Sequence, residues 1–280
     1  MLTDTQIDAY FKRIGFEGRV INSKHTLDEL VLAHQCTIPF ETVTLHRRGG
    51  GPRLETEFIF EKVVEHELGG YCFELNKLFE ELLASLGFEV RPALSRAVRG
   101  RGGRGGRGGR MPINHRGIIA YADEGACSVD VGFGGPMPAG ALLLSHDLEQ
   151  EIFGETYTPR ETENSWWKIE RLTQAAGDNY DDDKPVRRQV ELELCTAAVE
   201  DIDFSALNLY FSQPGTLFHD HEIVNLRTRS GYVGFKDVVL TVREDGRKTV
   251  SEIDDPQKVN ETLARCFGLR DVDEAVREGF

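Results

Sequence analysis

The chain has 280 residues, of which 40% are hydrophobic and 29% charged, the composition of a globular protein large enough for more than one core. Its formal net charge of −14 argues against general affinity for nucleic acids or anionic membrane surfaces, because both require a positive field. No apolar run approaches the roughly 20 residues that span a bilayer, and the first residues lack the basic start and apolar stretch of a signal peptide, so we expect a cytoplasmic protein with no membrane partner.

Residues 1–90 are predicted to be mostly helical. Residues 8–14 have apolar side chains at helical spacing. A second helix is predicted over residues 26–34, where Thr26 and Glu29 have the spacing of a capping box. Thr26 is therefore expected to cap that helix.

A longer helix is predicted over residues 72–86, where apolar residues recur in steps of three and four. Gly87 follows it, in the position where a glycine commonly ends a helix. The apolar spacing then changes. Residues 88–94 predict a strand, and residues 117–122 and 127–133 predict an antiparallel hairpin around an Asp-Glu-Gly turn.

The second half of the chain is predicted to consist mainly of strands. The expected elements are strands over residues 166–172 and 190–195, a short helix with a loop over 201–220, one hairpin over 223–253 and a helix over 256–269. Helices and strands thus occur in separate runs, which favours an α+β fold over alternating βαβ units.

Residues 99–110 form a low-complexity tract of arginine and glycine. Such a tract can bind RNA, but this one is short, has no interleaved aromatic residues and lies in an acidic chain. We therefore favour a flexible exposed loop between two strands and expect no nucleic-acid partner. An intermediate interpretation is that some of these arginines attract an anionic substrate.

The five cysteines are scattered, odd in number and without CxxC spacing: Cys36, Cys72, Cys127, Cys195 and Cys266. This pattern argues against a disulfide framework and against a cysteine zinc site, so no metal is expected. Most of these residues are expected to be small buried hydrophobic groups.

Cys72 is the candidate nucleophile among the five. Gly69 and Gly70 permit a sharp turn and close backbone approach just before it, and Cys72 then falls on the first turn of the predicted helix. The helix dipole and the free backbone N–H groups there favour a thiolate and can hold an oxyanion. The alternative is a buried structural cysteine behind a glycine pair that caps the helix.

His115 and Asp130 are the candidate partners of this thiol. His115 precedes one strand of the predicted hairpin, and Asp130 stands between two valines in the other, where a buried carboxylate requires a partner. The hairpin turn brings residue 130 back to the neighbourhood of residue 115. A histidine held by a carboxylate can act as a base toward a thiol. Taken singly, His115 is more typical of a satisfied loop histidine and Asp130 of a turn or strand-edge carboxylate. The prediction rests on the three residues together, in the order Cys-His-Asp.

These residues lie in segments that resemble the arylamine N-acetyltransferases. The family has a glycine pair before its nucleophile, an Ile-Pro-Phe-Glu segment upstream, a histidine before a strand and an Asp-Val-Gly-Phe-Gly segment. The matching positions are residues 38–41 with His46, residues 69–74, His115 and residues 130–134. The resemblance extends over nearly the whole chain.

The resemblance implies an α+β fold of three units with a core like that of cysteine proteases and transglutaminases. The first unit, residues 1–90, would be a helical bundle carrying the nucleophile. The second, residues 91–200, would be a central antiparallel β-barrel carrying the histidine and the aspartate. Residues 201–280 would form an interdomain segment and a C-terminal α/β lid.

The resemblance also implies a ping-pong reaction with acetyl-CoA as co-substrate and no metal. Cys72 would take the acetyl group as a thioester, and an arylamine, arylhydrazine or N-hydroxyarylamine would remove it. The implied binding residues are Phe40, Val98 and Phe133 for the aromatic acceptor, and Gly132 and Gly134 for coenzyme A.

The chain departs from the family in three places. Leu68 stands where the family has an arginine that pairs with the carboxylate matching Glu41, and we expect Arg13 to replace that cation. Thr42 stands where the family has asparagine. The arginine–glycine tract replaces a shorter connection.

Three alternative functions remain open at the level of sequence. The first is an amide synthase of the same fold that transfers a larger acyl group. The second is a transglutaminase-like hydrolase, which shares the Cys-His-Asp order. The third is a binding protein without enzymatic activity, built on the same scaffold with the arginine–glycine tract as its interaction arm.

Overall fold

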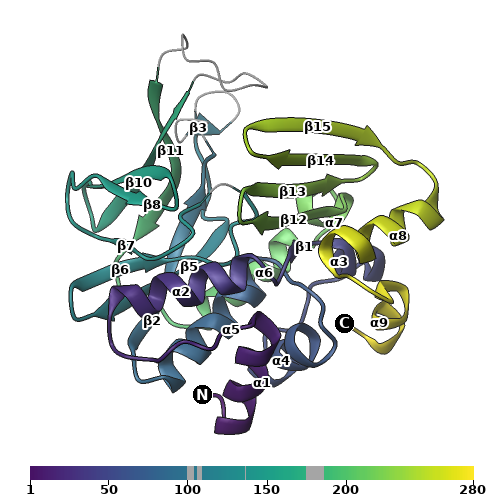
Figure 1. The fold of residues 1–280 in the computed structure, drawn as a ribbon, viewed down its shortest axis with the longest axis horizontal. Coiled ribbons are helices and arrows are strands. Elements are labelled where there is room, and N and C mark those ends of the chain that lie inside the picture. Colours follow the sequence, from purple (N-terminus) through teal and green to yellow (C-terminus); the bar gives the residue numbers. More distant parts are fainter. Residues whose placement is uncertain (100–103, 106–108, 136, 175–185) are drawn as a thin grey trace.

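The computed structural model describes residues 1–99, 104–105, 109–135, 137–174 and 186–280 (Figure 1). The predicted flexible loop therefore lies largely outside the described residues. Of the tract, the backbone of strands β3 (Arg104–Gly105) and β4 (Gly109–Arg110) is described, and these two strands pair with each other. No described helix combines the length and the apolar character needed to cross a bilayer.

Helices fill the N-terminal part of the chain. They are α1 (Asp4–Ile14), α2 (Lys24–Gln35), α3 (Val43–Arg48), α4 (Thr56–Phe60), the π-helical turn η1 (Glu61–Glu65) and α5 (Cys72–Ser85). The prediction that Thr26 caps the second helix is wrong. Ser23 has an extended backbone and its hydroxyl accepts the N–H of Thr26, so the helix begins two residues earlier than expected.

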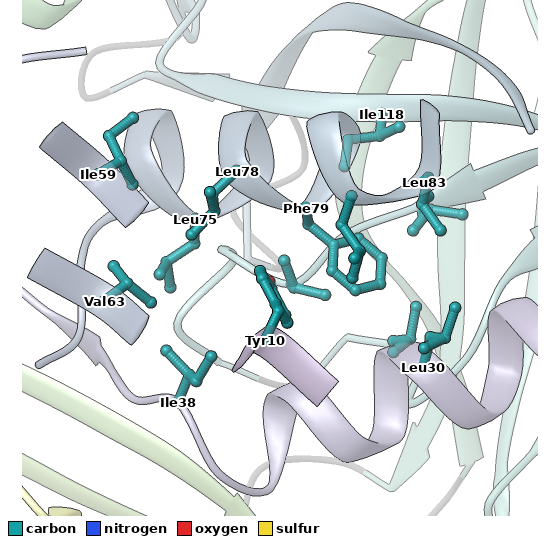
Figure 2. Close-up of a cluster of buried hydrophobic side chains, with 14 of the residues drawn as sticks. Tyr10, Leu30, Ile38, Ile59, Val63, Leu75, Leu78, Phe79, Leu83 and Ile118 are labelled. Atoms are coloured by element: carbon teal, nitrogen blue, oxygen red, sulfur yellow. The ribbon is translucent and has the colours of Figure 1, made fainter. Parts of the chain in front are cut away.

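The first hydrophobic core lies between these helices and the sheet behind them. Figure 2 shows Leu75 and Phe79 of α5 pointing toward Tyr10 of α1 and Val63 of η1. Ile118 belongs to the same core but comes from a strand, which fixes α5 against the sheet. The amphipathic face predicted for residues 72–86 is therefore buried on two sides.

An eight-stranded antiparallel sheet forms the second part of the fold, in the order β7-β6-β5-β2-β11-β10-β9-β8. Its strands are β2 (Glu89–Ala97), β5 (His115–Ala122), β6 (Gly125–Val129), β7 (Leu142–Leu143), β8 (Gln150–Ile152), β9 (Glu155–Glu161), β10 (Trp166–Gln174) and β11 (Val186–Cys195). The Gln150 side chain makes two hydrogen bonds to the Leu143 backbone and so joins the two edges. The sheet thereby curls into a nearly closed barrel.

The C-terminal part consists of α6 (Asp203–Phe211), α7 (Leu217–Asp220), β12 (Ile223–Thr228), β13 (Gly231–Lys236), β14 (Val239–Glu244), β15 (Arg247–Glu252), α8 (Pro256–Phe267) and α9 (Val272–Glu278). The single hairpin predicted over residues 223–253 is thus a meander of four strands. Its segments are short and half-exposed, and they are separated by two-residue turns at 229–230 and 237–238. Helix α8 ends at Gly268 as expected, whereas α9 was not predicted.

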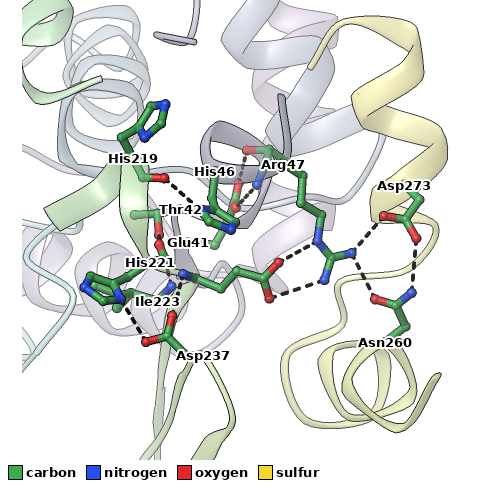
Figure 3. Close-up of polar contacts among 12 residues, drawn as sticks. Glu41, Thr42, His46, Arg47, His219, His221, Ile223, Asp237, Asn260 and Asp273 are labelled. Carbon is green, nitrogen blue, oxygen red and sulfur yellow. Dashed lines mark hydrogen bonds and ion pairs between the residues drawn. The ribbon is translucent and has the colours of Figure 1, made fainter. Parts of the chain in front are cut away.

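The C-terminal sheet is completed by the N-terminal part of the chain. Strand β1 (Phe40–Glu41) pairs with β12, so the sheet runs β1-β12-β13-β14-β15. Val43 and Leu68 belong to the core beneath this sheet. Figure 3 shows Arg47 of α3 reaching toward Asp273 of α9, with an N–O distance of 2.9 Å. The α+β prediction is confirmed, and the three parts share strands and cores.

Candidate active site

Cys72 is the first residue of α5, as predicted, and its side chain is buried. The turn before it is held by backbone hydrogen bonds from Gly70 N–H to Pro39 O (3.3 Å) and from Glu41 N–H to Gly70 O (2.8 Å). A side chain at Gly69 is impossible, because its Cβ would lie 2.3 Å from Pro39 O. The glycine pair therefore lets two chain segments touch directly behind the cysteine.

His115 and Asp130 meet as the hairpin predicts. Strands β5 and β6 pair in antiparallel register, and His115 Nε2 lies 2.5 Å from Asp130 Oδ2. Both side chains are buried, and the His115 ring also interacts with the Cys72 thiol. With Nε2 on the carboxylate, Nδ1 is the ring nitrogen available to the thiol. The structure thus brings the three predicted residues together.

The charge state of His115 is set by its partners. Burial alone would lower the pKa of the ring, but Asp130 and the Cys72 sulfur outweigh it and raise the pKa to about 10. The ring is therefore an imidazolium through the neutral range. A proton is therefore in place on the ring, next to the Cys72 sulfur.

Asn76 is a site residue that the sequence analysis did not single out. Its amide nitrogen donates to Asp130 Oδ1 (2.9 Å), and its amide oxygen accepts the Val131 N–H (2.8 Å). Asp130 Oδ1 also accepts the Gly132 N–H at 2.9 Å. The signal was present, because an asparagine four residues after Cys72 falls on the apolar face of the predicted helix, where it needs partners.

A cavity of about 940 Å³ opens between the barrel and the C-terminal sheet. Of the predicted binding residues, Phe40, Phe133 and Gly134 line it. Gly132 instead packs on the helix start, where an added Cβ would lie 2.8 Å from the Cys72 Cα. Val98 is fully buried and lies outside this lining, with its N–H bonded to Glu191 O.

The wall that the C-terminal sheet contributes to the cavity is basic. It includes Arg227, Arg229 and Arg243 from the C-terminal sheet and its turns. Arg227 is tied back to the buried site, because its Nε donates to Gln35 Oε1 (2.8 Å) and Gln35 Nε2 donates to Asp130 O (2.8 Å). The cavity wall and the buried aspartate are thus joined by one side chain.

The expectation that Arg13 pairs with Glu41 is wrong. Arg13 donates to the backbone oxygens of Val63 and Glu67 instead. The cation beside Glu41 is Lys62 of η1, whose Nζ lies 3.1 Å from Glu41 Oε1. Leu68, at the position of the family arginine, is buried in the core of the C-terminal sheet.

Thr42, the second departure, also has a structural role. Its hydroxyl donates to His221 O (2.8 Å) and accepts the Ile223 N–H (3.0 Å), at the start of β12. Thr42 therefore helps to attach the C-terminal sheet. All five cysteines are free, and no group of three or more His, Cys, Asp or Glu side chains among the described residues is arranged to hold a metal ion.

Comparison with known proteins agrees with this fold. Residues 24–276 match an N-acetyltransferase family. The chain is 38% identical to the arylamine N-acetyltransferase of Escherichia coli K12 over 146 residues, 51% of this chain and 49% of that protein. It is 29% identical to the Mycolicibacterium smegmatis enzyme over 273 residues, 94% and 91% of the two chains.

The solved structures give the same result. The arylamine N-acetyltransferase structure from M. tuberculosis superposes with a TM-score of 0.85 at 26% identity, covering 96% of this chain and 95% of the other. The chain belongs to the arylamine N-acetyltransferase family. Its alignments with the Escherichia coli and Salmonella typhimurium relatives span only about half of those proteins, 49% and 55%.

Proposed function

We propose that this protein transfers an acetyl group from acetyl-CoA to an arylamine, an arylhydrazine or an N-hydroxyarylamine through a thioester on Cys72. The observation that carries the proposal is the buried contact of Cys72, His115 and Asp130 at the start of α5, in a chain that belongs to this family. The division of labour would follow the units proposed from sequence: residues 1–90 supply the nucleophile, 91–200 the histidine and aspartate, and 201–280 cover the cleft.

In the first half-reaction, the Cys72 thiolate attacks the acetyl carbonyl carbon and forms a C–S bond. The first N–H groups of α5, which have no acceptor within the helix, stabilise the oxyanion. The C–S bond to coenzyme A then breaks, and the departing thiolate takes the proton from His115. Asp130 holds the ring in position throughout.

In the second half-reaction, the amine nitrogen attacks the thioester carbon and passes its proton to His115. Collapse of the oxyanion breaks the C–S bond, releases the amide and returns Cys72 as a thiolate beside the imidazolium. Phe40 and Phe133 are apolar aromatic walls suited to a flat acceptor. A thioester is reactive enough to acylate a weakly basic aromatic amine.

The charge of the cavity supports coenzyme A as the acetyl donor. The basic wall suits its phosphates, and Gly134 lies on the cavity near Phe40, where the thioester arm would pass. A structure of the Mycobacterium marinum family member is described as a complex with CoA; at 23% identity that likeness concerns the fold. The Salmonella typhimurium relative is also named an N-hydroxyarylamine O-acetyltransferase.

A second candidate is an amide synthase that moves a larger acyl group. The cavity volume favours it, as does a match to the proansamycin X synthase of Amycolatopsis mediterranei, 26% identical over 162 residues. Competing acetyl-CoA against long-chain acyl-CoA donors distinguishes the two. Preferential formation of the longer adduct would favour the synthase.

The proposal is tested by incubating the protein with acetyl-CoA and no amine, and measuring its intact mass. A single acetyl adduct is expected, absent from Cys72→Ala and retained in Cys195→Ala, which removes another buried cysteine. Addition of an arylamine should discharge the adduct as the acetylated amine. An adduct that survives in Cys72→Ala would exclude the nucleophile, and rapid discharge to water alone would indicate a hydrolase.

A further inference from the structure

Lys62 is a charged side chain enclosed next to the turn that leads into Cys72. It lies in η1 and is 1% exposed. Its ammonium group contacts Glu74 Oε1 (2.8 Å), Glu41 Oε1 (3.1 Å) and Thr44 Oγ1 (3.0 Å). An ammonium group has three N–H donors, and each of them has an acceptor here.

Both glutamates also hold the turn that leads into Cys72, Glu74 through its carboxylate and Glu41 through its backbone. Glu74 Oε2 accepts the Tyr71 N–H at 3.0 Å. The backbone N–H of Glu41 donates to Gly70 O at 2.8 Å, and its carboxylate accepts hydrogen bonds from Thr44. Two chain segments meet at residues 69–71, and Lys62 connects them. It binds one segment through the Glu41 carboxylate and the other through the Glu74 carboxylate.

The positive charge of Lys62 compensates in part for the burial of the two carboxyl groups. Burial alone would raise the pKa of Glu41, but Lys62 and the Thr44 hydrogen bonds lower it. Burial, together with the Glu41 charge, raises the pKa of Glu74 in spite of Lys62. Without the lysine, two carboxyl groups would share a site closed to water, and at least one would have to take up a proton or move.

We propose that Lys62 is a positioning residue for the nucleophile, which fixes the turn at residues 69–71 through Glu41 and Glu74 and so aims Cys72 at His115. This inference rests on the proposed function of Cys72. It also explains how Leu68 can occupy the apolar core of the C-terminal sheet, because the cation beside Glu41 arrives from η1 instead.

The test compares Lys62→Met and Lys62→Arg with Lys77→Met. Lys77 makes an ion pair of similar length on α5, 2.9 Å from Asp201, but this pair is more exposed and takes no part in the turn. The first readout is the rate of Cys72 alkylation by iodoacetamide across pH, which needs no acyl donor. The second is the rate of Cys72 acetylation at saturating acetyl-CoA, with KM measured separately.

Lys62→Met is expected to slow acetylation at saturating acetyl-CoA by about 100-fold, the cost of a misplacement of roughly 1 Å, with little change in KM. It should also shift the pH profile of alkylation. Lys62→Arg should recover most of the rate, and Lys77→Met should leave both readouts unchanged. Where Lys62→Met does not fold, Glu74→Gln, which keeps the volume, carries the same expectation.

A Lys62→Met protein with a lower melting temperature but an unchanged alkylation profile and acetylation rate would overturn the proposal, since Lys62 would then serve stability alone. Equal slowing by Lys77→Met would overturn it too. Failure of the proposed function gives a different result. The unmodified protein would then form no acetyl adduct, while the alkylation profile would still report whether Lys62 positions Cys72.

Discussion

His115 lies buried between two groups that both favour its charged form, the Asp130 carboxylate and the Cys72 sulfur. Burial opposes that charge, so the imidazolium persists only because both partners are fixed. Asp130 is held in turn by Asn76 and by the Gly132 N–H, and both bonds go to the oxygen that His115 does not use. The Asp130 carboxylate therefore orients the His115 ring and also holds the loop at Gly132 next to Cys72.

This arrangement predicts how stability depends on pH. The pKa of His115 is about 10 in the folded protein and roughly 6.5 in an unfolded chain, so the folded state binds more protons between these values. The contribution of His115 to the free energy of unfolding should be full below about pH 6.5 and should fall as pH rises toward 10, by at most about 1.4 kcal/mol per pH unit.

His115→Gln should flatten that dependence, because glutamine does not titrate. The measurement is urea unfolding of both proteins at about pH 6.5, 8 and 9.5, with the difference between them isolating His115 from the other titrating groups. Parallel curves for the two proteins would contradict the assignment of the proton to His115.

Single residues also mark how far sequence reasoning reaches. The proximity of Cys72, His115 and Asp130 was predictable from the three residues as a set, because a glycine pair precedes the cysteine's helix and a hairpin turn returns the aspartate toward the histidine. The partner of Glu41 was not. Arg13 and Lys62 are both cations in helical segments, and only the packing of η1 against α5 decides which of them reaches the carboxylate.

At the scale of elements, segments with regular apolar periodicity and tight turns were predicted correctly. Short half-exposed strands were not predictable from the sequence. Helix α5 and the β5–β6 hairpin follow the prediction because their apolar spacing is regular and a glycine marks their ends. The C-terminal meander differs from the single predicted hairpin. The turn at 237–238 contains neither glycine nor proline, and the turn at 229–230 has its glycine, Gly231, only at the start of the next strand. Helix α9 is only one to two turns long.

The loop after β6 packs on the start of α5, and Gly132 lies directly against Cys72 there. Gly132→Ala would place a Cβ 2.8 Å from the Cys72 Cα and 3.1 Å from Asn76 Nδ2, so the loop or the helix start must move. We expect Cys72 acetylation to slow by about 100-fold. The free energy of unfolding should fall by roughly 1–3 kcal/mol.

Gly50→Ala is the matched control for that substitution, because a Cβ at Gly50 meets no atom within 4 Å. Both substitutions add one methyl group to a loop glycine, but only Gly132→Ala places that group next to Cys72. Acetylation rates from intact mass and urea unfolding curves give the comparison. Equal rates in the two variants would show that the loop adapts without moving Cys72.

At the scale of the whole molecule, the three parts of the fold are interlocked and not merely joined in series. Phe40 and Glu41 form the edge strand of the C-terminal sheet, and Phe40 also lines the cavity. Val43 and Leu68 come from the helical part but belong to the C-terminal core, and Ile118 of the barrel belongs to the helical core. The cavity therefore has walls from all three parts.

Such sharing predicts one cooperative unfolding transition, despite a chain length at which separate domain transitions are common. Val43→Ala tests this, because Val43 is fully buried in the C-terminal core whereas both tryptophans, Trp166 and Trp167, lie on β10 of the barrel. Loss of the buried methyl groups should cost roughly 1–3 kcal/mol and lower the urea midpoint seen by tryptophan fluorescence as much as that seen by circular dichroism.

Val250→Ala, at a position 57% exposed on β15, should shift neither midpoint measurably. If Val43→Ala leaves the tryptophan midpoint unchanged, the barrel unfolds independently of the C-terminal sheet. The cavity would then lose the wall that this sheet contributes before it loses the others.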